Sequence, residues 1–130
     1  MANYYGSSRT NYFKVKDEVA FRAMVTKCGF ETVEEQGKFA LFPGKYSEGG
    51  FSYFDEDQDD NIELQDLVIP HLPDDEVVVV MEAGAEKLRY VVGLAYAFDN
   101  KGKVVVLSLD KIYSMAAKKW PKGSITRAEY

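Results

Sequence analysis

The segment that decides the fold is EVVVVMEAGAEKLRYVVGLAYAFDNKGKVVVLSL, residues 76–109. Its three apolar runs, Glu76–Ala83, Leu88–Phe98 and Val104–Leu109, are rich in the β-branched and aromatic residues that are typical of strands. The short stretches AGAEK and DNKGK separate the runs and supply glycine for tight turns. Strands joined by such short turns pair with their neighbours in the chain, so the segment predicts a three-stranded antiparallel meander.

The middle run has one face of large residues and one of small residues, because side chains alternate along a strand. The large face holds Tyr90, Val92, Leu94, Tyr96 and Phe98, and the small face holds Arg89, Val91, Gly93, Ala95 and Ala97. Since glycine and alanine let another element approach the sheet closely, we expect helices on the small face. The large face then needs cover from the rest of the domain, a second subunit or a partner.

Outside the meander, the clearest expected element is a helix from Asp17 to Cys28. Asp17 can cap its first turn, and Gly29 supplies the left-handed residue that ends many helices. Residues at helical spacing form one apolar stripe, which consists of Phe21, Met24, Val25 and Cys28. This pattern predicts an amphipathic helix packed against the sheet.

Shorter elements complete the expected fold. The expected strands are Asn11–Val15, a hairpin of Phe30–Glu34 and Lys38–Phe42 around Gln36 and Gly37, and Phe51–Phe54. A second helix should begin near Asn61, direct Ile62, Leu67 and Val68 inward, and end at Pro70. A last helix should follow Ser108 or Asp110 and contain Ile112, Met115 and Ala116.

The predicted order is β-α-β-β-β-α-β-β-β-α, which is typical of an α+β domain. We expect one such domain over residues 1–117, followed by a basic tail at 118–130. The 130 residues, 46% of them hydrophobic, suffice for one core. No secretory signal or membrane-length apolar run is seen, and the only cysteine is Cys28, so we expect a cytoplasmic protein without membrane contact.

Charge is distributed unevenly along the chain. The formal net charge is −5, but residues 46–86 contain 13 acids and no lysine or arginine. The remaining residues contain 8 acids and 16 bases. A block of acids with so little neutralisation nearby is a candidate surface for cations or for a basic protein.

The acidic block centres on DEDQDDNIELQD, residues 55–66. This stretch resembles an EF-hand calcium loop, especially the dockerin type that ends in aspartate. The resemblance implies a side-chain ligand at each of Asp55, Asp57 and Asp59, a carbonyl ligand at Asn61, a water-mediated ligand at Glu63 and a closing ligand at Asp66. Asp60 stands where such loops need glycine for a sharp turn. A protein-binding surface and a solvated loop are the two alternatives.

The sequence offers little for catalysis. His71 is the only histidine, which excludes a multi-histidine metal site, and Cys28 lies on an apolar helix stripe. No phosphate-binding loop, zinc spacing or nucleophile elbow is present. We therefore expect a non-enzymatic protein without a cofactor. Four bases around Trp120 form a basic tail, Lys118, Lys119, Lys122 and Arg127, for which a solvated terminus is the default and direct nucleic-acid binding is not expected.

Three stretches, SSRTNYFKVKDEVAF, EKLRYVVGLAYAF and LSLDKIY, resemble short accessory proteins of phages, plasmids and integrated elements. The resemblance implies a protein that binds host machinery, as inhibitors of restriction or CRISPR nucleases do. An acidic surface suits that role as a nucleic-acid mimic, because nuclease channels are basic and normally hold phosphates.

The leading hypothesis is a protein-binding module that offers acids and aromatic anchors to a basic groove, such as that of a nucleic-acid-binding protein. The proposed partner-binding residues are Tyr46, Glu48, Phe51, Tyr53, Phe54, Asp55, Glu56, Asp57, Asp59, Asp60, Glu63, Asp74, Asp75 and Glu76. One alternative is a module that binds calcium through residues 55–66. The other is a structural homodimer built on the large face of the middle strand.

Overall fold

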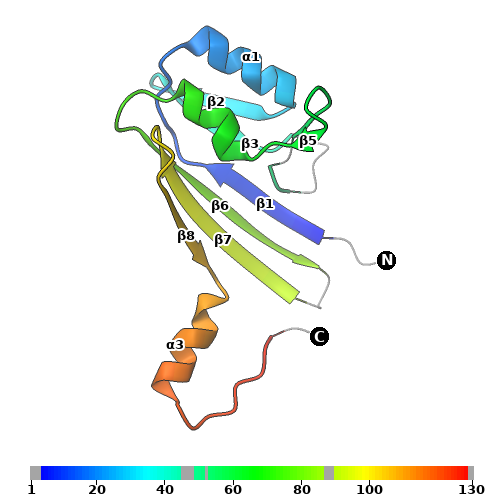
Figure 1. The fold of residues 1–130 in the computed structure, drawn as a ribbon, viewed down its shortest axis with the longest axis vertical. Helices are drawn as coiled ribbons and strands as arrows, with labels where there is room; N and C mark the ends of the chain where they lie inside the picture. Colours follow the sequence, from blue (N-terminus) through cyan, green and yellow to red (C-terminus); the bar gives the residue numbers. More distant parts are fainter. Residues whose placement is uncertain (1–3, 45–48, 52, 87–89, 129–130) are drawn as a thin grey trace.

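A four-stranded antiparallel sheet organises the fold in the computed structural model, which describes residues 4–44, 49–51, 53–86 and 90–128. The sheet order is β1-β6-β7-β8, and its strands are β1 (Tyr4–Thr10), β6 (Val77–Glu86), β7 (Tyr90–Asp99) and β8 (Val104–Ser108). Two small hairpins and three α-helices accompany the sheet (Figure 1). The α+β class and the meander of residues 76–109 are therefore confirmed, and β6 is longer at its end than expected.

The first strand lies earlier in the chain than predicted. β1 pairs with the free edge of β6, in a register that sets Ser8 opposite Glu82 and Thr10 opposite Val80. The expected strand Asn11–Val15 is wrong, since only Phe13 makes an isolated bridge, to Phe39. The YYGSSRT sequence of β1 is mostly small and polar, so its strand state comes from pairing with β6 and not from its own apolar pattern.

The predicted first helix and hairpin are confirmed. Helix α1 (Glu18–Cys28) begins at Asp17, whose side chain accepts hydrogen bonds from the Val19 and Ala20 amides, and ends at Gly29 with φ of 74°. The hairpin consists of β2 (Glu31–Glu35) and β3 (Lys38–Phe42). Its two turn residues, Gln36 and Gly37, both have positive φ, as a tight hairpin of this handedness requires.

The chain between the two halves differs from the prediction. The acidic stretch forms a hairpin of β4 (Phe54–Asp55) and β5 (Asp60–Asn61), so of the expected strand Phe51–Phe54 only Phe54 is in a strand. Helix α2 (Leu64–Val68) consequently begins later than Asn61 and passes into a 3₁₀ turn, η1 (Ile69–His71). Leu64 and Val68 are buried, whereas Ile62 and Leu67 are half-buried.

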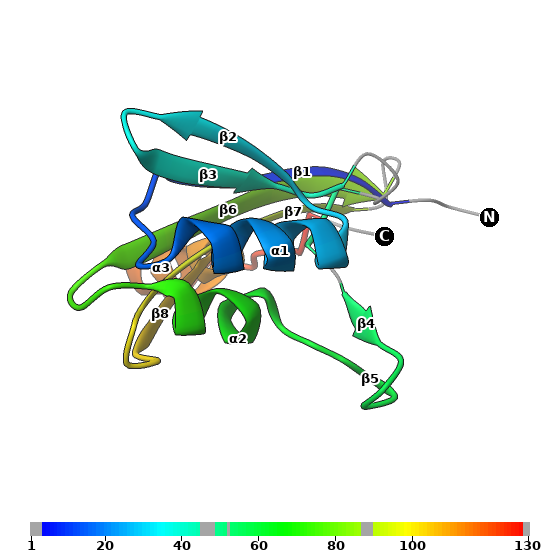
Figure 2. The same cartoon turned by 90° about the horizontal axis from the view of Figure 1, so that it is seen from above.

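The hydrophobic core lies on the large face of the sheet, which overturns the expected placement of the helices. Phe98 is 1% exposed and Tyr96 packs against the core formed with α1, α2 and the β2–β3 hairpin (Figure 2). On the small face, Val91 and the neighbouring Met81 are exposed. The aromatic side chains of the large face fill the space between the sheet and the helices. The glycine and alanine side chains of the small face are too small to fill that space.

The last helix, α3 (Lys111–Lys119), extends away from the sheet at the end opposite α1 (Figure 1). It has no buried residue. It begins after Ser108 and Asp110, as predicted. Asp110 occupies the N-cap position without a capping hydrogen bond from its side chain. The tail was expected from residue 118, but Lys118 and Lys119 are the last residues of α3. The chain after the helix turns back along it, so that Arg127 forms an ion pair with Asp110 at 3.4 Å. None of the described helices has the length and apolarity needed to cross a membrane.

Candidate functional site

The β4–β5 hairpin projects from the body of the molecule and carries most of the predicted acidic site (Figure 2). Local hydrogen bonds shape it: the Asp57 amide donates to Asp55 Oδ1 at 2.9 Å, and the Asn61 amide donates to Asp60 Oδ1 at 2.8 Å. Asp59 adopts a positive φ of 52°, which aspartate tolerates better than most residues. The left-handed residue of the turn is therefore Asp59, and Asp60 belongs to β5.

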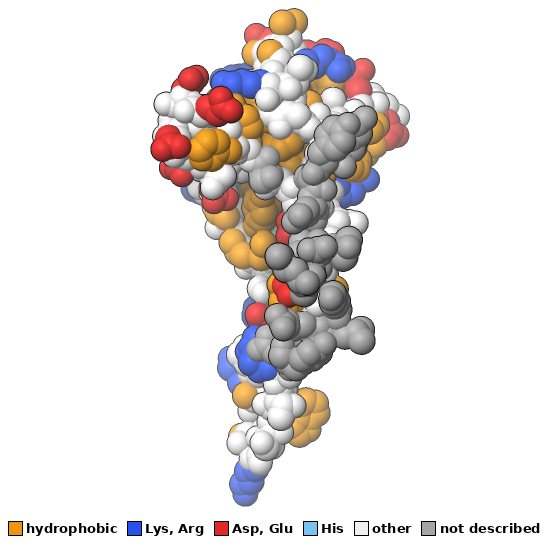
Figure 3. All heavy atoms as spheres, turned by 90° about the vertical axis from the view of Figure 1, so that its right-hand side faces the viewer, with side chains coloured by type: hydrophobic (Ala, Val, Ile, Leu, Met, Phe, Trp, Pro, Cys, Tyr) orange, Lys and Arg blue, Asp and Glu red, His pale blue; other side chains and the backbone are white. Residues whose placement is uncertain are grey.

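Asp55 of this hairpin is half-buried and its other acids are open to solvent, and all of them lack neutralising partners within the described residues. Glu56, Asp57, Asp59, Asp60 and Glu63 are exposed, and none of them forms an ion pair with a described lysine or arginine. In the space-filling view, acidic side chains gather on this projection (red, upper left in Figure 3). The hairpin is thus a concentrated patch of negative charge, and a nearby positive surface would feel it strongly.

The predicted aromatic anchors separate into two kinds. Phe54 is 49% exposed and lies on the hairpin itself. Phe51 and Tyr53 instead pack against the core, and the Phe51 ring meets Phe30 edge-on at 5.3 Å. Tyr46 and Glu48 lie outside the described residues. Among the described members, Phe54 is the one that offers a free aromatic face beside the acids.

The second predicted group of acids, Asp74, Asp75 and Glu76, lies apart from the hairpin. Helix α2 and η1 separate the two groups, and the second group precedes β6 at the other end of this layer (Figures 1 and 2). Asn100 Nδ2 donates to Asp74 Oδ1 at 3.0 Å, and the Lys14 amide donates to the Glu76 carboxylate. These two acids hold chain connections together, so the structure divides the predicted acidic surface in two.

The six residues proposed as calcium ligands do not curl around a common point. Asp55 and Asn61 lie in paired strands, and Asp66 belongs to the first turn of α2. Over the described ranges, no group of three or more His, Cys, Asp or Glu side chains is placed to hold a metal ion. The calcium hypothesis thus receives no geometric support from the described loop.

Two groups with chemical potential have packed surroundings. Burial raises the pKa of the Cys28 thiol, an effect that the nearby Lys27 opposes and Asp55 reinforces. Burial also lowers the pKa of His71, with a further contribution from Lys16, and its ring meets Phe21 edge-on at 5.9 Å. A raised thiol pKa disfavours the reactive thiolate, so Cys28 lacks the electrostatics of an activated nucleophile.

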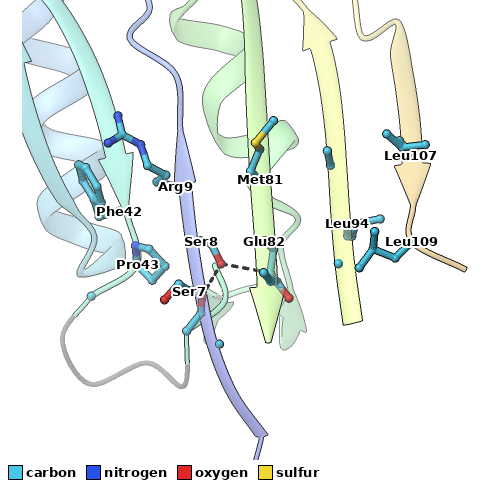
Figure 4. A pocket seen from close by; sticks show the side chains of 16 residues that line it. Ser7, Ser8, Arg9, Phe42, Pro43, Met81, Glu82, Leu94, Leu107 and Leu109 are labelled. Atoms are coloured by element: carbon cyan, nitrogen blue, oxygen red, sulfur yellow. Dashed lines mark hydrogen bonds between the residues drawn. The ribbon is translucent and has the colours of Figure 1, made fainter. Parts of the chain in front are cut away.

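A second site, which sequence reasoning missed, is an open trough of about 1000 Å³ (Figure 4). Its floor is the small face of the sheet, and its lining also includes Ser8, Glu82 and Leu94 of the large face. Its floor comes from β6, β7 and β8, and includes Met81, Ala95 and Leu107. Arg9 of β1 forms one wall together with Phe42 and Pro43, and its guanidinium lies 4.8 Å from the centre of the Phe42 ring. The small residues of β7 indicate open space above this face of the sheet. The wall could not be predicted, because its residues come from segments far from β7 in the sequence.

One polar contact among the lining residues lies on the large face of the sheet, because Ser8 is opposite Glu82 and Glu82 is opposite Leu94. The Ser8 hydroxyl donates to Glu82 Oε1 at 3.2 Å and contacts the Gly49 carbonyl (Figure 4). This contact ties the segment at Gly49 to β1 and β6, and the remaining lining is mainly apolar. The trough therefore suits an apolar protein segment better than a charged small molecule.

Comparison with protein-family models, with curated proteins and with solved structures finds no match to this chain. The acidic hairpin and the trough are therefore the structural features that bear on function.

Proposed function

We propose that this protein is a non-enzymatic binding module that uses the β4–β5 hairpin to engage a basic groove on a nucleic-acid-binding protein. The observation that supports this proposal is the set of exposed carboxylates on one projecting hairpin, none paired with a described lysine or arginine. Carboxylates that have no partner in the fold retain their full attraction for an external cation. They would steer the encounter with a basic groove and occupy positions that phosphates normally fill.

The hairpin also supplies an apolar contact. Phe54 is paired with Asn61 in the strand ladder, so its backbone is held while its ring stays half exposed. A rigid aromatic residue loses little conformational entropy on binding and contributes buried area at the centre of an interface. We propose that Phe54 inserts beside the basic residues of the partner, with the acids of the turn around it.

We infer the class of partner from this chemistry and from the sequence resemblance to accessory proteins of mobile elements. Nucleases and defence complexes of the host have basic channels for nucleic acid, and an acidic hairpin can enter such a channel as a mimic. We propose inhibition of a host nuclease or defence complex as the outcome of that binding. The experiment must therefore measure both binding and competition with nucleic acid.

A matched pair of variants tests the proposal. Glu56→Lys/Asp57→Lys changes the hairpin, and Glu31→Lys/Glu35→Lys changes exposed acids on β2 by the same net charge. The immobilised wild-type protein is used to capture proteins from a bacterial lysate, and each captured protein is then purified and titrated against all three forms. We expect a nucleic-acid-binding protein whose affinity falls at least about tenfold with the hairpin variant and changes little with the control.

Double-stranded DNA added as a competitor should displace the wild-type protein from that partner, and higher salt should weaken the complex. Equal losses with the two charge variants would show that only net charge matters. Binding that is unaffected by the hairpin variant and by DNA would refute the proposed site.

A further inference from the structure

The trough on the small face and the apolar side of helix α3 are two exposed apolar surfaces of this molecule. Glycine and alanine on β7 leave room for a helix above the sheet, yet α1 and α2 lie on the opposite face. Met81 and Leu107 on the trough floor are 62% and 56% exposed. Exposed apolar side chains that lie next to one another on a sheet mark a candidate interaction surface.

Helix α3 has the complementary feature, an apolar stripe that contacts nothing buried. Three apolar residues along it and at its end are between 55 and 62% exposed: Ile112, Met115 and Trp120. An amphipathic helix of nine residues is marginal in water unless its apolar face is covered. An apolar surface that covers the stripe would therefore stabilise the helix.

The chain connection prevents α3 from reaching the trough of its own sheet. Only Leu109 and Asp110 lie between β8 and α3. The Leu109 amide donates to the Gly93 carbonyl at 2.9 Å, and the Ile112 amide donates to the Leu109 carbonyl at 3.0 Å, so the helix leaves the sheet in a determined direction. Figure 1 shows that this direction points away from the body.

Charge makes a second copy of the chain a suitable occupant. Residues 110–130 hold five bases and two acids, a net charge of +3, whereas residues 1–109 hold 11 bases and 19 acids, a net charge of −8. The basic end of one copy is therefore attracted to the acidic body of another. A two-fold arrangement would fill both troughs and cover both helices at once.

We propose that the protein forms a homodimer in which α3 of each copy packs into the small-face trough of the other. Ile112 and Met115 lie over Ala95 and Leu107 of the second copy. This surface differs from the large face of β7, where Tyr96 and Phe98 are already packed in the core of their own chain. The proposed contact does not include the acidic hairpin, although the hairpin contributes to the negative charge of the body.

Sedimentation equilibrium is the first test. The wild-type protein should be a dimer, and both Ala95→Asp in the trough and Met115→Lys on α3 should raise the dissociation constant at least about tenfold, because each puts a charge in an apolar contact. Val19→Lys, at an exposed position on α1, is the matched control and should leave the dimer intact. Circular dichroism checks that each variant is folded. The dimer should also weaken with added salt.

Cysteine crosslinking is the second test and identifies the contact itself. In a Cys28→Ser background, chains with Ala95→Cys are mixed with chains with Met115→Cys, and a two-chain crosslinked product is expected. Neither chain alone should give that product in comparable yield. A wild-type monomer at every concentration overturns the proposal. A dimer that ignores both charge variants, or a 95–115 crosslink that forms only within a doubly substituted chain, overturns it equally.

Discussion

Leu109 closes over Gly93: its amide donates a hydrogen bond to the Gly93 carbonyl at 2.9 Å, and its side chain occupies the space that a Cβ at position 93 would need. A Cβ there would lie 2.5 Å from Leu109 Cδ1. The glycine thus allows the chain after β8 to cross the edge of the small face. This contact determines where α3 begins and, with the short connection, the direction in which it leaves.

Glycine substitutions should differ according to what the new side chain meets. Gly49 has φ of 102°, and a Cβ there would overlap the backbone of Gly6, which cannot move without disturbing β1. We expect Gly49→Ala to lower the free energy of unfolding by about 2 kcal/mol or more. Gly93→Ala should cost under about 1 kcal/mol, because the exposed Leu109 side chain can rotate away. Urea denaturation measures both, and a larger loss at Gly93 would contradict the structure.

Thr10 joins the sheet to the β2–β3 hairpin through a buried hydroxyl. Its Oγ1 accepts a hydrogen bond from the Leu41 amide and donates one to the Asn11 carbonyl, both at 2.8 Å, and the residue is 1% exposed. Thr10→Val keeps the shape but leaves the Leu41 amide without its partner. We expect a loss of about 1–3 kcal/mol in the free energy of unfolding.

The control for this prediction is Thr10→Ser, which retains the hydroxyl and loses only a methyl group. Thermal or urea denaturation should rank the serine variant above the valine variant. If valine were as stable as the wild type, the hydroxyl would not connect the two elements in solution.

Phe21 is the aromatic centre of the core between α1 and the hairpin. It is fully buried, meets Phe13 edge-on at 5.8 Å and lies 5.2 Å from Phe39. We expect Phe21→Ala to lower the free energy of unfolding by about 3–5 kcal/mol through lost burial and a residual cavity. Val19→Ala, at an exposed position of the same helix, should change it by less than about 0.5 kcal/mol. Similar values for both variants would place Phe21 outside the core.

Tyr96 should make stability fall in alkaline solution. Burial, with smaller contributions from Glu63 and Glu82, raises the pKa of its phenol from 10.0 to about 12. The unfolded chain therefore releases this proton at lower pH than the folded chain does. The stabilisation is complete below pH 10 and is lost as the pH rises toward the folded pKa of about 12.

The measurement is the free energy of unfolding from pH 8 to 11.5 for the wild type and Tyr96→Phe. The difference between the two proteins should change above pH 10 in favour of phenylalanine, which has no proton to lose. Other tyrosines contribute equally to both curves and cancel. Parallel curves would mean that the Tyr96 phenol titrates alike in both states.

Local signals predicted several elements accurately. The Asp17 cap, the apolar stripe and Gly29 determined α1, and the positive φ available at Gln36 and Gly37 determined the hairpin turn. By contrast, β1 has no apolar alternation that would predict a strand. Its strand state comes from hydrogen bonds to β6. Its residues gain their structure from partners that lie 70 to 82 positions away in the chain.

The acidic site shows the same division. Its charge and its exposure follow from the residues themselves, since carboxylates without partners stay in water. Its shape could not be predicted from the sequence. The residues of this stretch are equally compatible with a metal-binding loop, the start of a helix, and the two-residue ladder between Phe54–Asp55 and Asp60–Asn61 that is observed. The separation of Asp74, Asp75 and Glu76 from the hairpin depends on the path of α2 and η1.

By itself, then, the sequence determined the α+β class, the meander, α1 and the concentration of negative charge, because each depends on neighbours within one turn or one strand pair. Only the tertiary structure decided which face of the sheet is buried. Large and small faces of β7 are both compatible with a covering helix, and the choice depends on the combined volume of side chains from α1, α2 and the β2–β3 hairpin. That choice placed the aromatic residues inside and left the small face open as a trough.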